Sequence, residues 1–299
     1  MKSFNEKERR CEASFLSAGP YWHADTPGKE TPLIFVTDED FCFAMNVIAQ
    51  AAALYPEIVI IAFEVMNNHF HFVLSCKESE VYEFWNFIRK RLSRIFPQLK
   101  DVAIKVRQIK DISDLRNNII YTNRNGYVAD YSHTPFSYPW GTGRFYFQPP
   151  VNGTPISRIK TDARRTMFRG RSPELPVDWV TIDNYIAPSS YCAISFGMAI
   201  FRDAHHYFNA LTRNVEAYAG VAKDLGDDEF LTDTEVFEKI RMTLKENYGG
   251  VRLRELTKSQ KLDLARSMRY EYRSSNGQIR RILDLSAFEI DSLFPLNKK

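Results

Sequence analysis

The chain is poor in cysteine and contains no long apolar run. Its four cysteines are scattered over 299 residues, and no two of them form a Cys-x-x-Cys pair. This spacing argues against a zinc ribbon and a disulfide framework, so a reducing compartment is expected. The N-terminus is charged and lacks the apolar segment of a signal peptide, and no apolar stretch approaches the length of a membrane span. We therefore expect a soluble, cytoplasmic protein with no membrane partner.

An excess of either charge is also missing, because the formal net charge is only +3. The charges are nevertheless clustered. Residues 158–171 contain six basic side chains and one acidic side chain, and residues 245–281 contain ten basic and four acidic side chains. Residues 224–238 contain seven acidic side chains and no basic one. This clustering suits a nucleoid-associated protein whose basic patches bind nucleic-acid phosphates, while its acidic connector is repelled by those phosphates. Ordinary solvated surface would give the same composition.

What the chain does have is an apolar fraction of 44%, which supports a large core in one domain or several smaller ones. One apolar run, residues 66–74, contains His69 and His71. In a β-strand, side chains two residues apart share a face, so both imidazoles can point at one metal ion while Phe70 and Phe72 pack into the core. The alternative is a pair of histidines that only hydrogen-bond their neighbours on a half-buried strand.

Periodicity and capping signals predict a series of elements around this run. Strands are expected at residues 33–36, 58–63, 72–74 and 102–107, with helices at 38–54 (capped by Thr37 or Asp38), 78–96, 113–125 (closed by Gly126), 161–170 and 192–222. The acidic stretch that follows is predicted to be a linker.

The helix at 113–125 has an unusual polar face. Leu115 and Ile119 mark its apolar side, whereas Asn118, Tyr121 and Asn125 share another side at i, i+3 and i+7. As an oxygen donor, Asn125 would complete a mixed nitrogen and oxygen site for Mg²⁺ or Mn²⁺. Tyr121, one turn earlier, would project beside that ion, whose charge favours the phenolate of a group with an ordinary pKa of about 10.

The C-terminal region resembles a DNA-binding fold. A helix at 259–273, a second at 278–283, a break at 284–286 and a last helix at 287–294 follow the helix-turn-helix pattern, although a generic three-helix bundle would look similar. We expect contacts to DNA phosphates from Arg280 and Arg281 in this region and from Arg89, Lys90, Arg94 and Arg124 upstream. Each of these side chains is also consistent with ordinary solvated surface.

Several motifs together resemble a known family. Residues 66–74 read Met-Asn-Asn-His-Phe-His-Phe-Val-Leu, similar to the Met-Pro-Asn-His-x-His-hydrophobic signature of single-tyrosine HUH transposases. Residues 120–125, Ile-Tyr-Thr-Asn-Arg-Asn, look like the Tyr-Ile-His-x-Asn-Pro motif of that family. Residues 138–142 are similar to its Pro-Trp-Ser-Ser element, and residues 21–28 occupy the place of its opening strand. Over residues 15–150, the order and spacing look most like the REP-associated tyrosine transposase branch.

The resemblance implies an α+β fold, with an antiparallel HUH-type sheet carrying the histidines and helices packed on it. It implies a catalytic domain at residues 1–150, a helical and basic connector at 151–244 and a helix-turn-helix domain at 245–299. The implied activity is cleavage and rejoining of single-stranded or hairpin DNA by a monomer or homodimer. In that reaction Tyr121 is the nucleophile, His69, His71 and Asn125 bind Mg²⁺ or Mn²⁺, and a 5′-phosphotyrosine is formed. The alternatives are a non-catalytic DNA-binding regulator and a nuclease that uses water.

Overall fold

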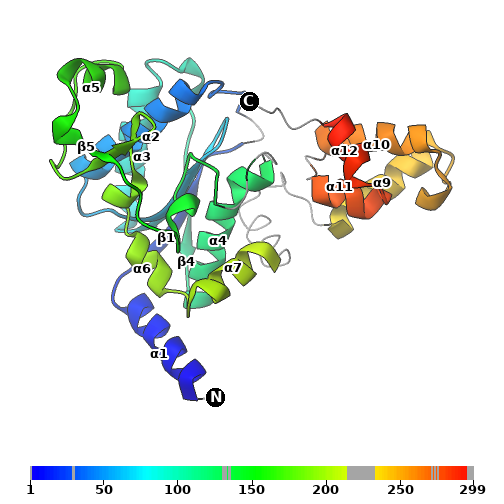
Figure 1. Ribbon diagram of the computed structural model, residues 1–299, viewed down its shortest axis with the longest axis horizontal. Coiled ribbons are helices and arrows are strands. Elements are labelled where there is room, and N and C mark those ends of the chain that lie inside the picture. Colours follow the sequence, from blue (N-terminus) through cyan, green and yellow to red (C-terminus); the bar gives the residue numbers. More distant parts are fainter. Residues whose placement is uncertain are drawn as a thin grey trace. The chain divides into compact units, whose positions relative to one another are not determined.

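The computed structural model describes residues 2–28, 31–129, 133, 136–213, 233–270, 272, 274 and 276–294 (Figure 1). The chain divides into two compact units, one made of residues 1–126 and 135–214 and the other of residues 127–134 and 215–299. These limits differ from the boundaries at 150 and 244 expected from the sequence. Residues 151–213 belong to the first unit because they pack on it, and a helix of the second unit crosses position 244.

The first unit contains a large sheet, a small sheet and surrounding helices. Its strands are β1 (Tyr21–Asp25), β2 (Val59–Val65), β3 (Phe70–Ser75), β4 (Lys105–Ile109), β5 (Thr154–Pro155), β6 (Val180–Ile182) and β7 (Tyr185–Ile186). Its helices are α1 (Lys2–Leu16), α2 (Asp38–Leu54), α3 (Glu78–Leu92), α4 (Ile112–Ala129), α5 (Thr161–Met167), α6 (Ile194–Ala199) and α7 (Ala204–Arg213). Short 3₁₀ turns are η1 (Pro97–Leu99), η2 (Gly143–Phe145), η3 (Ile156–Arg158) and η4 (Pro188–Ser190).

The large sheet has the strand order β2-β3-β1-β4, and all of its neighbouring strands are antiparallel. Strand β3 therefore lies inside the sheet, with β2 and β1 on its two sides. Across β3, His71 pairs with Asp25 of β1 and with Glu64 of β2, and directly paired residues point to the same face. The α+β architecture with the histidine strand in an antiparallel sheet is thus confirmed.

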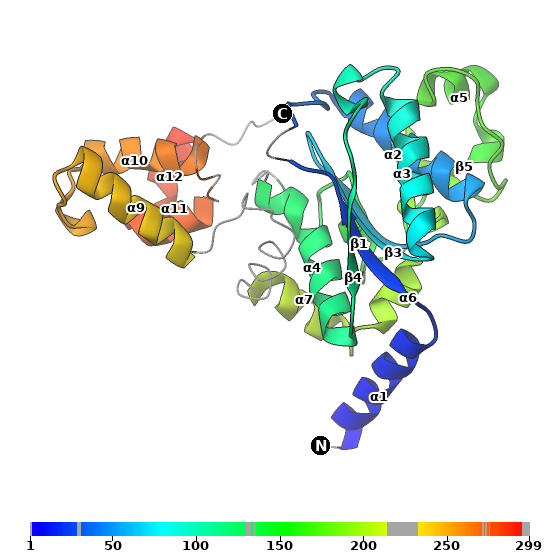
Figure 2. The same ribbon diagram turned by 180° about the vertical axis from the view of Figure 1, so that it is seen from behind.

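The two faces of the sheet are covered by different helices (Figure 2). On one face, Phe70 and Phe72 pack edge-on against Trp85 and Phe84 of α3, with ring centroids 5.4 and 5.7 Å apart. The opposite face, which carries His71, is covered by α4. The predicted alternation of the β3 side chains is therefore realised, with Phe70 and Phe72 on one side and His71 on the other.

The strand expected at residues 33–36 is absent from the structure. Ile34 and Phe35 both donate their backbone N–H groups to the same carbonyl, that of Asn67, at 3.0 and 2.9 Å. Two donors that share one acceptor do not form the repeating hydrogen bonds of a strand pair, so the segment does not join the sheet. Its apolar character serves the core instead, because Phe35 is buried with its ring centroid 5.6 Å from that of Phe70.

Helix α2 matches the prediction from Asp38 to Leu54, and Thr37 caps it in a reciprocal capping box with Asp40. Helices α3 and α5 end earlier than expected. Helix α3 stops at Leu92, and a turn leads from there to η1, which begins at Pro97. Helix α5 stops at Met167, because the backbone turns left-handed at Arg169.

The helix predicted at 192–222 is two short helices, α6 and α7. Asp203 interrupts it, since its side chain accepts the backbone N–H of His206 at 2.9 Å and so starts a new helix. Residues 214–222 of that prediction lie outside the described residues. The predicted acidic linker is also outside them as far as residue 232, and its remainder forms the start of helix α9 (Asp233–Asn247).

Helix α4 corrects a prediction about Gly126. The sequence suggested that this glycine closes the helix in a left-handed conformation, but α4 continues to Ala129 and Gly126 is helical. A Cβ atom at Gly126 would lie 2.2 Å from the ring of Tyr138. The glycine therefore allows close packing of a tyrosine on the helix, rather than a change in backbone direction.

Residues 151–191 pack on the outer side of α2. Strands β5, β6 and β7 form an antiparallel sheet, and an apolar cluster joins this region to Ala49. Asn46 of α2, which is fully buried, donates to the carbonyls of Met167 and Asn184 at 3.1 Å and accepts from the backbone N–H of Ile186 at 2.9 Å. This amide thereby fixes the region on α2.

The second unit is helical where the structure describes it. It contains α9, η5 (Leu253–Glu255), α10 (Lys258–Tyr270), α11 (Asn276–Leu283) and α12 (Ala287–Leu293). Its buried core includes Ile240, Met268, Ile279 and Ile290. Ser286 starts α12 with a capping box to Glu289, so the three C-terminal helices lie close to their predicted positions. No helix in the described ranges of either unit is long and apolar enough to span a bilayer.

Candidate metal and nucleophile site

The two predicted histidines converge on the face of the sheet under α4. The Nε2 atoms of His69 and His71 are 3.0 Å apart, and both residues are buried. Burial, with a smaller contribution from His23, holds the pKa of His71 well below its ordinary value, so this ring is neutral. Two ligands about 2.1 Å from one ion and at right angles would be about 3 Å apart. The pair therefore has the spacing of adjacent ligands on a single cation.

Asn68 fixes the orientation of His69. Its amide nitrogen donates to the carbonyls of Gly28 and Thr31 at 2.7 and 2.8 Å, which sets the direction of the amide. The amide oxygen then lies 2.7 Å from His69 Nδ1 and accepts its proton. A histidine that carries its proton on Nδ1 has a lone pair on Nε2, the atom that faces His71.

His71 has a corresponding partner in His23, which the sequence analysis did not identify. His23 lies on β1, is fully buried, and places its Nε2 atom 3.4 Å from His71 Nδ1. Burial, followed by the nearby charge of Arg107, lowers the pKa of His23 to about 3, so this imidazole is also neutral. His23 Nε2 can accept a hydrogen bond from the N–H at His71 Nδ1. His71 Nε2 then carries a lone pair. Two polar residues at alternating positions of β1, His23 and Asp25, were the available sequence signal.

Tyr121 of α4 lies against these rings. Its ring centroid is 5.3 Å from that of His71 and 5.8 Å from that of His23, with edge-to-face geometry in both contacts. Tyr121 is fully buried. The structure thus brings the predicted nucleophile next to the predicted ligand His71, as the helical spacing of α4 suggested.

The two asparagines on this side of α4 differ in their surroundings. Asn118 is engaged in the framework, because its oxygen accepts from Arg107 at 2.9 Å and its nitrogen donates to the carbonyl of Asp114 at 2.7 Å. Asn125, one turn beyond Tyr121, is fully buried. Among the described residues no three histidine, cysteine or acidic side chains are arranged to hold a metal ion. An amide such as that of Asn125 is therefore needed to extend the donor set beyond the histidine pair.

Helix α4 is held to the sheet at both of its ends. Near its start, Arg107 of β4 makes two hydrogen bonds to the carboxylate of Asp114, at 3.0 and 3.1 Å. Near its end, Glu64 of β2 accepts the backbone N–H of Gly126 at 2.8 Å. Burial raises the pKa of Glu64 well above its ordinary value. Glu64 is also the cross-strand neighbour of His71, so one buried carboxyl group joins the histidine strand to the helix of Tyr121.

The segment 138–142, noted in the sequence for its resemblance, has a positioning role. The backbone N–H of Val65 donates to the carbonyl of Trp140 at 2.8 Å, which adds this segment to the outer edge of β2. Thr142 accepts the backbone N–H of Phe63 at 3.0 Å and donates to the side chain of Asn123 at 2.7 Å. The segment thereby connects β2 to the middle of α4.

The predicted basic contacts are spread over the molecule. Arg124 is half-buried on α4, in the residue before Asn125. Arg89, Lys90 and Arg94 belong to or follow α3, which covers the opposite face of the sheet. Arg89 donates to the carbonyl of Lys100 and to Asn86, while Lys90 and Arg94 are exposed. Arg280 and Arg281 are exposed on α11 of the second unit. Of this set, only Arg124 is on the helix of Tyr121.

Comparisons with known proteins add little to this geometry. No family model and no curated protein matches the chain. A solved structure described as "Structure of the REP associates tyrosine transposase bound to a REP hairpin" is similar over 55% of this chain and 87% of that chain. The sequence identity is 14% and the TM-score is 0.33.

Proposed function

We propose that the first unit cleaves and rejoins single-stranded DNA through a covalent link between Tyr121 and a 5′-phosphate. The observation that supports this proposal is the contact between the ring of Tyr121 and that of His71, whose Nε2 atom faces His69 Nε2 at 3.0 Å. A tyrosine beside two imidazoles whose Nε2 atoms face each other combines a candidate nucleophile with a candidate cation site.

The residues present fit a divalent ion such as Mg²⁺ or Mn²⁺. His69 and His71 would supply two nitrogens, and Asn125 would supply an amide oxygen. When bound, such an ion polarises a phosphodiester and offsets the charge that develops on its oxygens. Asn68 and His23 would keep the two imidazoles in the ligand tautomer.

The chain's own part in the reaction is a balanced exchange of ester bonds. The Tyr121 oxygen forms a bond to phosphorus, and the bond between phosphorus and the 3′-oxygen breaks. The phenolic proton is released and a proton is taken up by the departing 3′-oxygen, which leaves a 5′-phosphotyrosine and a free 3′-hydroxyl. Attack by a 3′-hydroxyl on the same phosphorus reverses the exchange, because the ester bond energy is retained.

In this proposal the helices of the second unit form a helix-turn-helix domain that adds DNA affinity. Arg280 and Arg281 on α11 would contact phosphates, as Arg89, Lys90, Arg94 and Arg124 would in the first unit. The protein would act as a monomer or homodimer on single-stranded or hairpin DNA.

An adduct assay tests the proposal. A single-stranded hairpin oligonucleotide, labelled at its 3′ end or at its 5′ end, is incubated with protein and Mg²⁺ or Mn²⁺ and resolved under denaturing conditions. We expect the 3′ label to migrate with the protein, because the downstream fragment carries the phosphotyrosine, and the 5′ label to leave with the free 3′-hydroxyl. Tyr121→Phe should lose the adduct, whereas Tyr82→Phe, at an exposed position on α3, should retain it.

Two other outcomes would contradict it. Undiminished cleavage by Tyr121→Phe would indicate a nuclease that uses water as the nucleophile. Tight DNA binding with no adduct in either metal would indicate a regulator that binds DNA without cutting it.

A further inference from the structure

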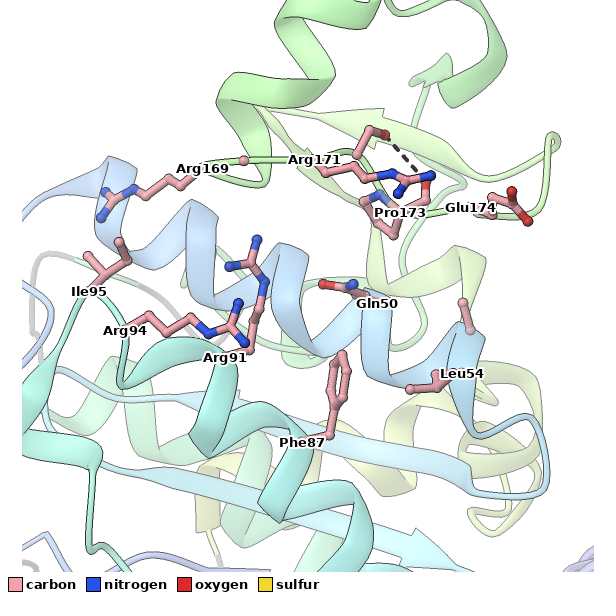
Figure 3. Close-up of a pocket in the computed structure, with 13 residues that line it drawn as sticks. Gln50, Leu54, Phe87, Arg91, Arg94, Ile95, Arg169, Arg171, Pro173 and Glu174 are labelled. Atoms are coloured by element: carbon pink, nitrogen blue, oxygen red, sulfur yellow. Dashed lines mark hydrogen bonds between the residues drawn. The ribbon is translucent and has the colours of Figure 1, made fainter.

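A basic cavity lies in the first unit, on the side of the sheet that α4 does not cover. Its volume is about 900 Å³, it is open to solvent, and it is bordered by α2, α3 and the segment after α5 (Figure 3). Four arginines, Arg91, Arg94, Arg169 and Arg171, line it together with a single acid, Glu174. In Figure 3, Arg91 and Arg94 face the segment that carries Arg169 and Arg171 across the cavity.

Two of these arginines are held in place by the fold. Arg91 donates to the carbonyl of Phe168 at 2.7 Å, and Arg169 forms an ion pair with Asp40 at 2.9 Å. Both guanidinium groups also lie over the ring of Phe43, at 5.7 and 5.0 Å from its centroid. Part of the positive charge is therefore preorganised, so little side-chain freedom remains to be lost when an anion binds.

The backbone after α5 is shaped to present the other side of the cavity. Arg169 has a φ of 43° and Gly170 a φ of 154°, so two consecutive residues adopt positive φ. This conformation is uncommon for arginine and persists only where its surroundings hold it. Here the Asp40 ion pair and the contact with Phe43 hold it, and the turn places Arg171 at the cavity.

The charge of the cavity is only partly neutralised. Asp40 is paired with Arg169, and neither Arg94 nor Arg171 forms an ion pair with any residue in the described parts of the chain. Burial, and after it the like charge of the nearby Arg94, lower the pKa of Arg91. A bound anion would offset this positive charge and accept hydrogen bonds in the forked geometry that arginine offers to phosphate.

The remaining wall has features that a small solvated ion would not need. Phe87 presents a half-buried ring, and the side-chain oxygen of Gln50 is buried with no hydrogen-bond partner within the residues that the structure describes. An aromatic face and an unsatisfied amide next to four guanidinium groups suit a ligand that carries a base or sugar beside its phosphate.

We propose that this cavity binds a phosphate group of a nucleotide unit, supplied either by the DNA backbone or by a free nucleotide. Residues 169–174 complete the site, so it depends on the region after residue 150 that has no counterpart in the family resemblance. The site is separate from Tyr121 and does not require DNA cleavage.

The test compares two double variants in a Tyr121→Phe background, in which binding is measured without cleavage. Arg94→Gln/Arg171→Gln removes the two exposed arginines of the cavity. Lys100→Gln/Arg165→Gln removes the same charge from exposed positions that do not line it. One arm titrates 2′-deoxyadenosine 5′-monophosphate by calorimetry. The other follows binding of a 12-nucleotide single strand by fluorescence anisotropy at several salt concentrations.

If DNA is the source of the phosphate, the slope of log affinity against log salt concentration should be shallower by about 1.4 in the cavity variant than in the control variant, since each lost contact to a single-strand phosphate removes about 0.7. If a free nucleotide is the source, the mononucleotide should bind the parent protein and bind the cavity variant at least tenfold more weakly, with DNA binding unchanged. Equal behaviour of the two double variants in both arms would overturn the proposal, and would leave the role of Tyr121 untouched.

Discussion

His23 and His71 face each other across neighbouring strands, with 3.4 Å between His23 Nε2 and His71 Nδ1. Together with the 2.7 Å contact between Asn68 and His69, this gives each imidazole of the proposed metal pair its own buried partner. Both Nε2 atoms are thereby directed to the same point. The relationship predicts that metal affinity depends on residues that do not touch the metal.

Substitution of His23 by alanine should weaken Mn²⁺ binding about 10- to 100-fold, because His71 loses the group that fixes its tautomer. His23→Gln keeps an acceptor oxygen and should recover part of the loss. The measurement is calorimetric titration of Mn²⁺ in the absence of DNA. His205→Ala, at an exposed histidine of α7, is the control and should bind Mn²⁺ normally. Wild-type affinity in His23→Ala would contradict the assignment.

Asn68→Ala should destabilise the first unit by about 1–3 kcal/mol, because the carbonyls of Gly28 and Thr31 and the His69 ring lose a shared partner. Urea unfolding monitored by tryptophan fluorescence gives this free energy. Asn86→Ala removes an exposed amide from α3 and should change it by less than about 0.5 kcal/mol. Equal unfolding midpoints for the two variants would show that Asn68 does not anchor His69.

Glu64→Gln should stabilise the protein at alkaline pH. The folded-state pKa of Glu64 is raised above the ordinary value of 4.5, so above that pH the unfolded chain releases the proton first. The free energy of unfolding then falls by about 1.4 kcal/mol per pH unit until the folded-state pKa is reached. Glutamine cannot ionise and still accepts the N–H of Gly126.

Thermal unfolding at pH 4 and pH 8 measures this difference. The melting temperatures of wild type and Glu64→Gln should agree at pH 4 and separate at pH 8, where the variant is higher. The titrations of His23 and His71 are common to both proteins and cancel in the comparison. A variant that is less stable at pH 8 would mean that the ionised carboxylate of Glu64 is required.

Gly126→Ala should destabilise the protein by about 1–3 kcal/mol through the clash with Tyr138, although alanine normally favours a helix over glycine by about 1 kcal/mol. Introduced into a Tyr138→Ala protein, the same substitution should become neutral or stabilising, because the obstructing ring is gone. Unfolding free energies of the four proteins in this double-mutant cycle give the answer. A cost of Gly126→Ala that persists without the ring would point to backbone strain instead.

The parts of the site that follow from local periodicity were predictable from sequence. Alternation along residues 69–74 gave the shared face of His69 and His71, and helical spacing gave the common side of Tyr121 and Asn125. His23 and Glu64 were missed because their proximity to His71 depends on which strands pair and in what register. His23 and His71 are 48 positions apart in sequence, and no local pattern encodes that pairing.

The same reasoning explains the other differences. Gly126 looked like a helix end because the sequence alone cannot show the ring of Tyr138 resting on it. The arginine cavity was not foreseen either, since Arg91 meets the carbonyl of Phe168 across 77 positions of sequence. Residues 91–94 and residues 169–171 each contain only half of that charge cluster.

Asn46 has a practical consequence for shortening this protein. All hydrogen-bond partners of its buried amide are backbone groups of residues 167, 184 and 186. A chain that ends at residue 150 would therefore leave this amide without partners and expose the apolar surface around Ala49. Such a fragment should aggregate on expression, whereas one that runs through Arg213 retains these partners. Recombinant versions of the first unit are therefore best ended after α7.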